Sequence, residues 1–173
     1  MTAIEAPTLG AYRIEPSEST IEFATRHLFG LAPVRGTFTL REGVVHVADP
    51  VEASMVRATI DATSFDTGLA ARDDTVRSPR YLDAARHPEI TFVANGVDRN
   101  EVLAGTLTVR GRTEPLDVRI DEIRVLGHRL QLRARAEVDR FAWGITAGKG
   151  MTGRRLRITL ALVATQLPAP GDA

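Results

Sequence analysis

The chain contains no cysteine, which excludes disulfide bonds, thiolate metal sites and a cysteine nucleophile. An excess of either charge is also absent, because 22 Lys and Arg residues balance 22 Asp and Glu residues. A bulk polycation that binds nucleic acid through its phosphates is therefore excluded. No apolar run approaches the roughly 20 residues that a membrane-spanning helix needs. The N-terminal sequence MTAIEAPTLGAYRIEP lacks the basic and apolar regions of a signal peptide, so we predict a cytoplasmic location.

Familiar catalytic and metal-binding motifs are lacking too. The sequence has no GxSxG elbow, no P-loop and no HExxH pair. A GxGxxG pattern occurs at 148–153, but the following residues RRLRITLAL alternate like a strand, whereas a dinucleotide-binding motif opens a helix. We interpret it as a glycine-rich connection between strands. The alternative is a loop whose N–H groups, with Lys149, Arg154 and Arg155, meet an anionic headgroup at a barrel mouth.

What the sequence does have is apolar residues at every second position. The clearest runs lie at 116–121, 130–139 and 155–162, and shorter ones lie near 21–23, 36–40, 56–62 and 90–92. Such alternation gives each strand one apolar and one polar face, as in antiparallel sheets. Turn residues separate the runs, for example Asn95-Gly96. We therefore predict an all-β fold, an antiparallel barrel of about eight strands.

The alternation stops between Phe65 and Ile90, where we expect a short helical insertion. Asp66 or Thr67 is a candidate N-cap for two or three helical turns, and Ser78-Pro79 would end them. The length of 173 residues predicts one domain, over residues 11–166, with flexible segments at 1–10 and 167–173.

Several motifs resemble those of the YceI-like family, which is also called polyisoprenoid-binding or lipocalin-like. The segments that carry the resemblance are STIEFATRHLFGLAPVRGTF at 19–38, SFDTGLAARDDTVRSPRYLDAARHPEITF at 64–92, GTLTVRGRTEPL at 105–116, and Arg140-Phe141 followed by Trp143-Gly144-Ile145. The resemblance runs from about Tyr12 to about Thr165. It implies an eight-stranded lipocalin-like barrel that holds a long isoprenoid lipid, such as a polyprenyl diphosphate or a quinone. It also implies a homodimer, and it requires no further cofactor.

Our hypothesis is therefore a binding, transport or sequestration protein rather than an enzyme. Small inward residues such as Ala134 and Ala136 favour a hollow barrel. The alternative is a filled barrel that acts as a stress or interaction module through its outer surface. A second alternative is an enzyme that uses His27 with a nearby carboxylate as an acid–base pair. The candidate ligand-binding residues are Phe23, His27, Phe38, Ile60, Phe65, Leu69, Leu82, Phe92, Leu107, Phe141 and Trp143. Of these, Phe65, Leu69 and Leu82 are expected to close one end of the barrel.

Overall fold

A computed structural model describes residues 3–172, and the predicted flexible ends reach beyond this range at Met1, Thr2 and Ala173. The described residues form nine strands: β1 (Gly10–Ile14), β2 (Thr20–His27), β3 (Ala32–Val47), β4 (Met55–Asp66), β5 (Glu89–Val97), β6 (Val102–Val109), β7 (Arg112–Leu126), β8 (Arg129–Asp139) and β9 (Arg155–Gln166). They also form the helix α1 (Ala70–Arg77) and the short 3-10 turns η1 (Pro16–Glu18), η2 (Val51–Ala53) and η3 (Arg140–Trp143). No helix among them is long and apolar enough to cross a membrane.

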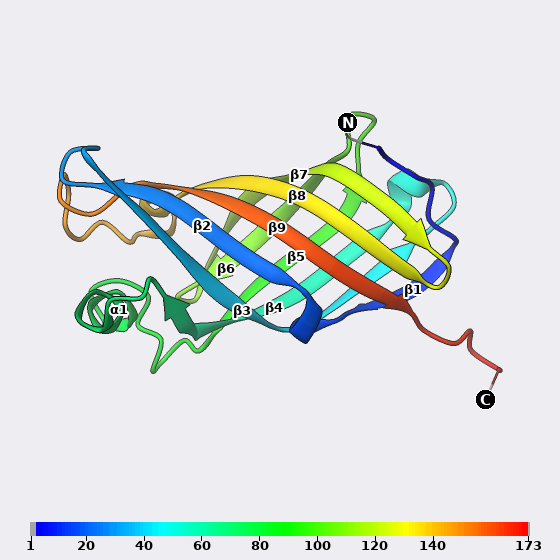
Figure 1. Ribbon diagram of the computed structural model, residues 1–173, viewed down its shortest axis with the longest axis horizontal. Coiled ribbons are helices and arrows are strands. Elements are labelled where there is room, and N and C mark those ends of the chain that lie inside the picture. Colours follow the sequence, from blue (N-terminus) through cyan, green and yellow to red (C-terminus); the bar gives the residue numbers. More distant parts are fainter. Residues whose placement is uncertain (1–2, 173) are drawn as a thin grey trace.

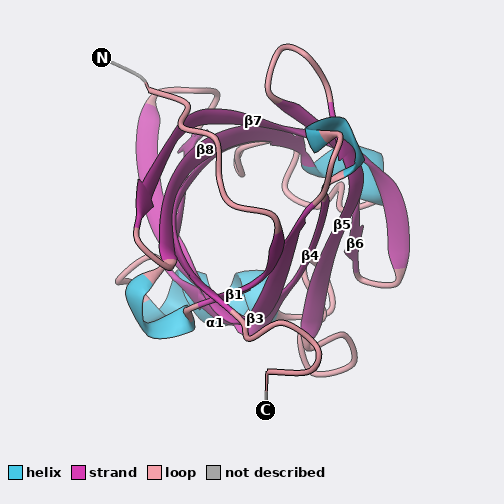
Figure 2. Ribbon diagram, turned by 90° about the vertical axis from the view of Figure 1, so that its right-hand side faces the viewer, coloured by secondary structure: helices cyan, strands magenta, loops and turns pink. Residues whose placement is uncertain are grey.

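The strands close into an antiparallel barrel. Strands β2 to β9 form the ring in the order β3-β2-β9-β8-β7-β6-β5-β4, and pairing of β3 with β4 closes it. The ninth strand, β1, pairs with both β3 and β9 and fills the gap beyond the start of the short strand β2. Figure 1 shows the barrel from the side, and Figure 2 shows it from one end. The predicted all-β barrel of about eight strands with a short helical insertion is confirmed.

Alternation along β8 and β9 shows how the sequence produces a hollow interior. In this pair, Leu132 lies opposite Leu162 and Ala134 opposite Leu160, all on the inner face. The inward side chains Leu160 and Leu162 are nevertheless only half-buried. Side chains on the inner face of a filled barrel would be fully buried by close packing. Their residual accessibility therefore reflects unfilled space inside the barrel.

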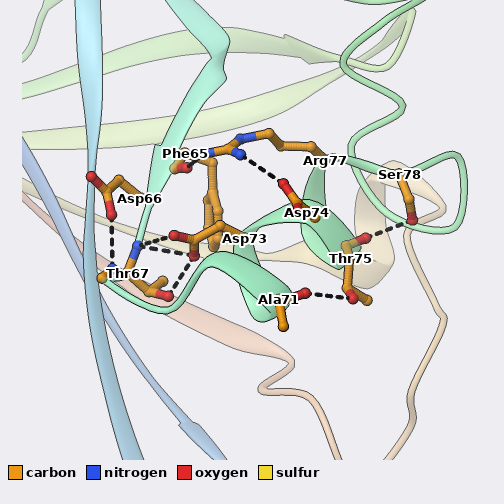
Figure 3. Close-up of polar contacts among 10 residues, drawn as sticks. Phe65, Asp66, Thr67, Ala71, Asp73, Asp74, Thr75, Arg77 and Ser78 are labelled. Atoms are coloured by element: carbon orange, nitrogen blue, oxygen red, sulfur yellow. Dashed lines mark hydrogen bonds and ion pairs between the residues drawn. The ribbon is translucent and has the colours of Figure 1, made fainter.

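Helix α1 begins one turn later than the predicted cap. Its N-cap is Leu69, and no side chain caps it, so the expectation of Asp66 or Thr67 is wrong. The carboxylate of Asp66 instead accepts a hydrogen bond from the Gly68 amide at 2.7 Å, which makes a turn before the helix. The helix ends where predicted, at Ser78, whose hydroxyl donates to the carbonyl of Thr75 at 2.6 Å (Figure 3).

One buried carboxylate attaches α1 to the barrel. Asp73 is 4% exposed and accepts hydrogen bonds from both the backbone amide and the hydroxyl of Thr67, at the end of β4 (Figure 3). Arg77 donates in turn to the carbonyl of Phe65. Burial alone would raise the pKa of Asp73, but the hydrogen bonds from Thr67, with Arg77 and Arg72 nearby, hold that pKa below its ordinary value.

Candidate functional site

The interior of the barrel is an apolar cavity of about 610 Å³. All nine strands contribute to its wall, and 37 of the 43 lining residues are apolar. The six polar or charged ones are Glu5, Asp49, Ser54, Asp98, Glu101 and Arg140. A volume of this size is typical of cavities that bind one apolar ligand. The filled-barrel alternative predicted no cavity, and in that respect it is wrong.

The η3 turn and the loop after it, residues 140–154, shape one end of the cavity. There Trp143 and Ile145, together with Leu82 from the segment after α1, contribute buried side chains to the lining. The indole of Trp143 donates to the carbonyl of Leu107 at 2.8 Å, which fixes its orientation. We refer to this as the η3 end.

Arg140 is the cation that lines the η3 end, and three of its five N–H donors bind backbone carbonyls. It donates to the carbonyls of Gly153 and Ile145, both at 2.8 Å, and of Thr152 at 3.1 Å. Burial lowers the pKa of Arg140 from its ordinary value. Its side chain therefore organises the loop through most of its donors.

The other end of the cavity is crossed by residues 3–9, which we call the strap (Figure 2). The strap is tied to β7: Ile4 pairs with Ile123, and the amide of Val125 donates to the Glu5 carboxylate at 2.6 Å. Four carboxylates line the cavity at this strap end, from Glu5, Asp49, Asp98 and Glu101. The charged lining residues of this mouth are therefore all acidic, whereas the cation among the lining residues, Arg140, belongs to the opposite end.

Six of the predicted site residues line the cavity, and five do not. The lining members are Phe38, Ile60, Leu82, Phe92, Leu107 and Trp143. The remaining five, Phe23, His27, Phe65, Leu69 and Phe141, lie elsewhere for the reasons given below.

Phe23 and Phe65 are buried, but they face each other instead of the cavity. Their rings stack with centroids 5.1 Å apart, and Phe38 contacts both, at 5.6 Å from Phe23 and 5.5 Å from Phe65. Phe23 also covers Gly36, its cross-strand partner, where a side chain would clash with the Phe23 ring. The three rings form a packed aromatic cluster, of which only Phe38 reaches the cavity.

Phe141 and Leu69 lie on the outside. The ring of Phe141 is only half-buried and has three cationic groups near its face: the guanidinium groups of Arg154 at 4.6 Å and Arg140 at 5.1 Å, and the Lys149 ammonium at 5.6 Å. Leu69 is 54% exposed at the start of α1, so of the three residues expected to close one end, only Leu82 contributes to the lining.

His27 is likewise not among the lining residues. Its Nδ1 accepts a hydrogen bond from the Gly153 amide at 3.1 Å, which joins β2 to the loop before β9. Burial lowers the pKa of His27, and the cations Arg72 and Arg140 lower it further. Among the described residues, no carboxylate pairs with its ring. The acid–base pair that the enzyme alternative requires is therefore not formed here.

The sequence hypothesis missed most of the aliphatic wall and all of the strap. Ile4, Pro7 and Leu9 line the mouth although their segment was expected to be flexible. The sequence gives only a weak indication that these three apolar side chains face the cavity, because their segment lacks the alternation of a strand.

Comparison with known proteins assigns this barrel to a family. The model of the YceI-like domain matches residues 12–164. The chain belongs to the YceI-like family.

Among curated YceI-like relatives, Protein YceI of Escherichia coli O157:H7 is 34% identical over 106 residues, and a UPF0312 protein of Pectobacterium carotovorum is 32% identical over 106 residues. Both matches cover 59% of this chain and 55% of the relative, so the chain aligns with about half the length of these proteins.

Two solved structures share the fold of this YceI-like chain. BcnA of Burkholderia cenocepacia superposes with a TM-score of 0.72 at 21% identity, over 88% of this chain and 99% of that one. A polyisoprenoid binding domain from Saccharophagus degradans superposes with a TM-score of 0.69 at 14% identity, over 92% and 100%.

Proposed function

We propose that this YceI-like barrel binds a long apolar isoprenoid-type lipid in its cavity, and so carries or sequesters it. The observation that carries the proposal is a cavity of about 610 Å³ in which 37 of the 43 lining residues are apolar. Burial of a hydrocarbon chain contributes roughly 0.8 kcal/mol per CH₂ removed from water. The structural neighbour described as a polyisoprenoid binding domain supports the same class of ligand.

Of the two isoprenoid headgroups, a quinone suits this cavity better than a diphosphate. Four carboxylates line the strap end, where they would repel a diphosphate. At the η3 end the Arg140 guanidinium already donates to three backbone carbonyls. A quinone carries no charge and needs no cation, so we propose that the ligand has an uncharged headgroup.

The single tryptophan provides a direct test. Trp143 is the one Trp of the chain and lines the cavity, so a bound quinone should quench its fluorescence. We expect saturable quenching by a long-chain isoprenoid quinone, and competition by an uncharged polyprenol of the same length. A polyprenyl diphosphate should compete much less effectively. Absence of saturable quenching and of polyprenol binding would disprove the carrier proposal, whereas equal competition by the diphosphate would disprove the headgroup preference alone.

A matched pair of substitutions locates the binding site. Ala136→Leu adds three carbon atoms to the inner face of β8 and narrows the cavity, so quinone affinity should fall by about tenfold. Ala161→Leu makes the same change on β9, at an exposed position that does not line the cavity, and should leave affinity unchanged. Equal affinities of the two variants would place the quinone outside the barrel.

A further inference from the structure

The most exposed large apolar side chains lie together at the η3 end of the barrel. The hairpin between β2 and β3 carries Leu28, Phe29 and Leu31, which are 46%, 79% and 82% exposed, and the neighbouring loop carries Met151, which is 52% exposed. We call these four residues the apolar tip. Phe29 and Leu31 are the two most exposed large apolar side chains of residues 3–172. Contiguous exposed apolar residues are typical of interaction surfaces.

The backbone holds the apolar tip in this outward arrangement. The amide of Leu28 donates to the Met151 carbonyl at 3.0 Å, and that of Phe29 donates to the Gly150 carbonyl at 2.7 Å. Leu28 and Phe29 have φ values of 51° and 57°, a left-handed conformation that is uncommon for such residues. Hydrogen bonds between the two loops therefore stabilise a local conformation that presents apolar side chains to solvent.

Positive charge surrounds the apolar tip. Residues 24–36 and 140–155 contain six Arg and Lys residues and no Asp or Glu: Arg26, Arg35, Arg140, Lys149, Arg154 and Arg155. Arg154 and Arg155 pair with Asp139 and Glu137, but within the described chain Arg26 and Lys149 form no ion pair with a carboxylate. The lining carboxylates lie at the opposite, strap end. The apolar tip and its flanking loops are therefore locally basic, although the whole chain has a formal net charge of +0.

From this combination we propose that the apolar tip docks on the surface of a lipid bilayer that contains anionic headgroups. Apolar side chains ringed by Arg and Lys insert into the interface while the cations contact the headgroups. Docking would place the barrel next to the hydrocarbon interior of the membrane, in which isoprenoid lipids dissolve. The inference goes beyond the proposed lipid binding, and it is tested without any cavity ligand.

A second copy of the chain is a poorer occupant of this surface. A symmetric dimer places the same patch of both protomers face to face. Docking of one apolar tip against another would bring the unpaired cations Arg26 and Lys149 close to their own counterparts. An anionic bilayer instead supplies charge of the opposite sign.

Vesicle co-sedimentation tests the proposal. The full chain should bind phosphatidylcholine vesicles that contain phosphatidylglycerol, and F29S/L31S should bind them at least about tenfold more weakly, because two exposed apolar side chains are lost. Leu126→Ser is the matched control, since Leu126 is 53% exposed in the turn between β7 and β8, away from the apolar tip. It should bind like the unaltered chain. The far-ultraviolet circular dichroism spectrum and an unchanged thermal unfolding transition verify that each variant is folded.

A second variant tests the charges without touching the apolar side chains. R26Q/K149Q should bind the anionic vesicles about tenfold more weakly and lose most of the preference for phosphatidylglycerol over pure phosphatidylcholine. Failure of the full chain to bind anionic vesicles while it still binds quinone would overturn the docking proposal and leave lipid binding intact. Conversion of a dimer to a monomer by F29S/L31S, with no vesicle binding by the full chain, would assign the apolar tip to a second copy instead.

Discussion

His27 lies at the end of β2, where its ring joins the hairpin to the loop before β9. The hydrogen bond from the Gly153 amide needs an unprotonated Nδ1, so it exists only while the imidazole is neutral. Burial and the cations Arg72 and Arg140 lower the pKa of His27 from its ordinary value of 6.5 and keep the ring neutral. The neutral imidazole of His27 therefore connects the end of β2 to the loop before β9.

This linkage predicts that the protein loses stability in mild acid. Because the pKa of His27 is lower in the folded than in the unfolded chain, the unfolded chain binds the proton first as the pH falls. The free energy of unfolding should be unaffected by His27 well above pH 6.5 and should decrease as the pH falls below that value. Chemical denaturation at a series of pH values measures this slope, and His27→Gln should flatten it. An identical slope in the variant would show that His27 titrates equally in both states.

Alternation predicts on which face of a strand a residue lies, and this is why Ile60, Phe92 and Leu107 could be assigned to the interior from sequence. It does not distinguish an inward residue that faces the cavity from one that packs against a neighbour. Phe23 has the correct parity, but it packs against Phe65 and Phe38 instead of the cavity. The partner of His27 could not be predicted either, because Gly153 is 126 residues distant along the chain.

Helix α1 is an element of eight residues, too short to be stable without tertiary contacts. Its apolar contribution is small, because Asp73 is its one buried residue. Attachment therefore depends on polar groups: the Asp73 carboxylate bound to Thr67 and the Arg77 guanidinium bound to the carbonyl of Phe65. The sequence predicts the end of α1 from Ser78-Pro79, but not its start, because Thr67 and Asp66 could equally cap a helix or form the preceding turn.

Neutralising the buried carboxylate should detach this element. In Asp73→Asn, an amide replaces one acceptor oxygen by a donor that faces the Thr67 amide, so we expect a loss of about 1–3 kcal/mol in the free energy of unfolding. The neighbouring Asp74→Asn removes only an exposed ion pair with Arg77 and should change stability by no more than about 0.5 kcal/mol. Denaturant titration compares the two variants directly. Equal stability losses would contradict a special role for Asp73.

At the scale of the whole molecule, the barrel combines a closed ring of hydrogen bonds with an interior that side chains do not fill. A cavity of about 610 Å³ deprives its wall of packing contacts that a filled core would have. Sequence alternation predicts the ring, because every strand needs one apolar face. It leaves open whether the ring is hollow, since that depends on the summed volume of side chains from all nine strands and on the strap.

A ligand that fills this space should therefore stabilise the folded chain. Any molecule that binds only the folded state adds about 2.7 kcal/mol at a concentration 100 times its Kd, which for a chain of this size is a rise of about 5–10 °C in Tm. Scanning calorimetry with a long-chain isoprenoid quinone should show this rise, and a polyprenyl diphosphate of equal length should give a smaller one.

The Ala136→Leu variant should show a smaller rise than Ala161→Leu, because its cavity is already partly filled by protein. Since the added leucine replaces some of the missing contacts, the ligand-free Ala136→Leu variant should be at least as stable as the unaltered chain. A large loss of stability without ligand, with an undiminished rise upon quinone addition, would mean that the interior near Ala136 is packed and that the quinone binds elsewhere.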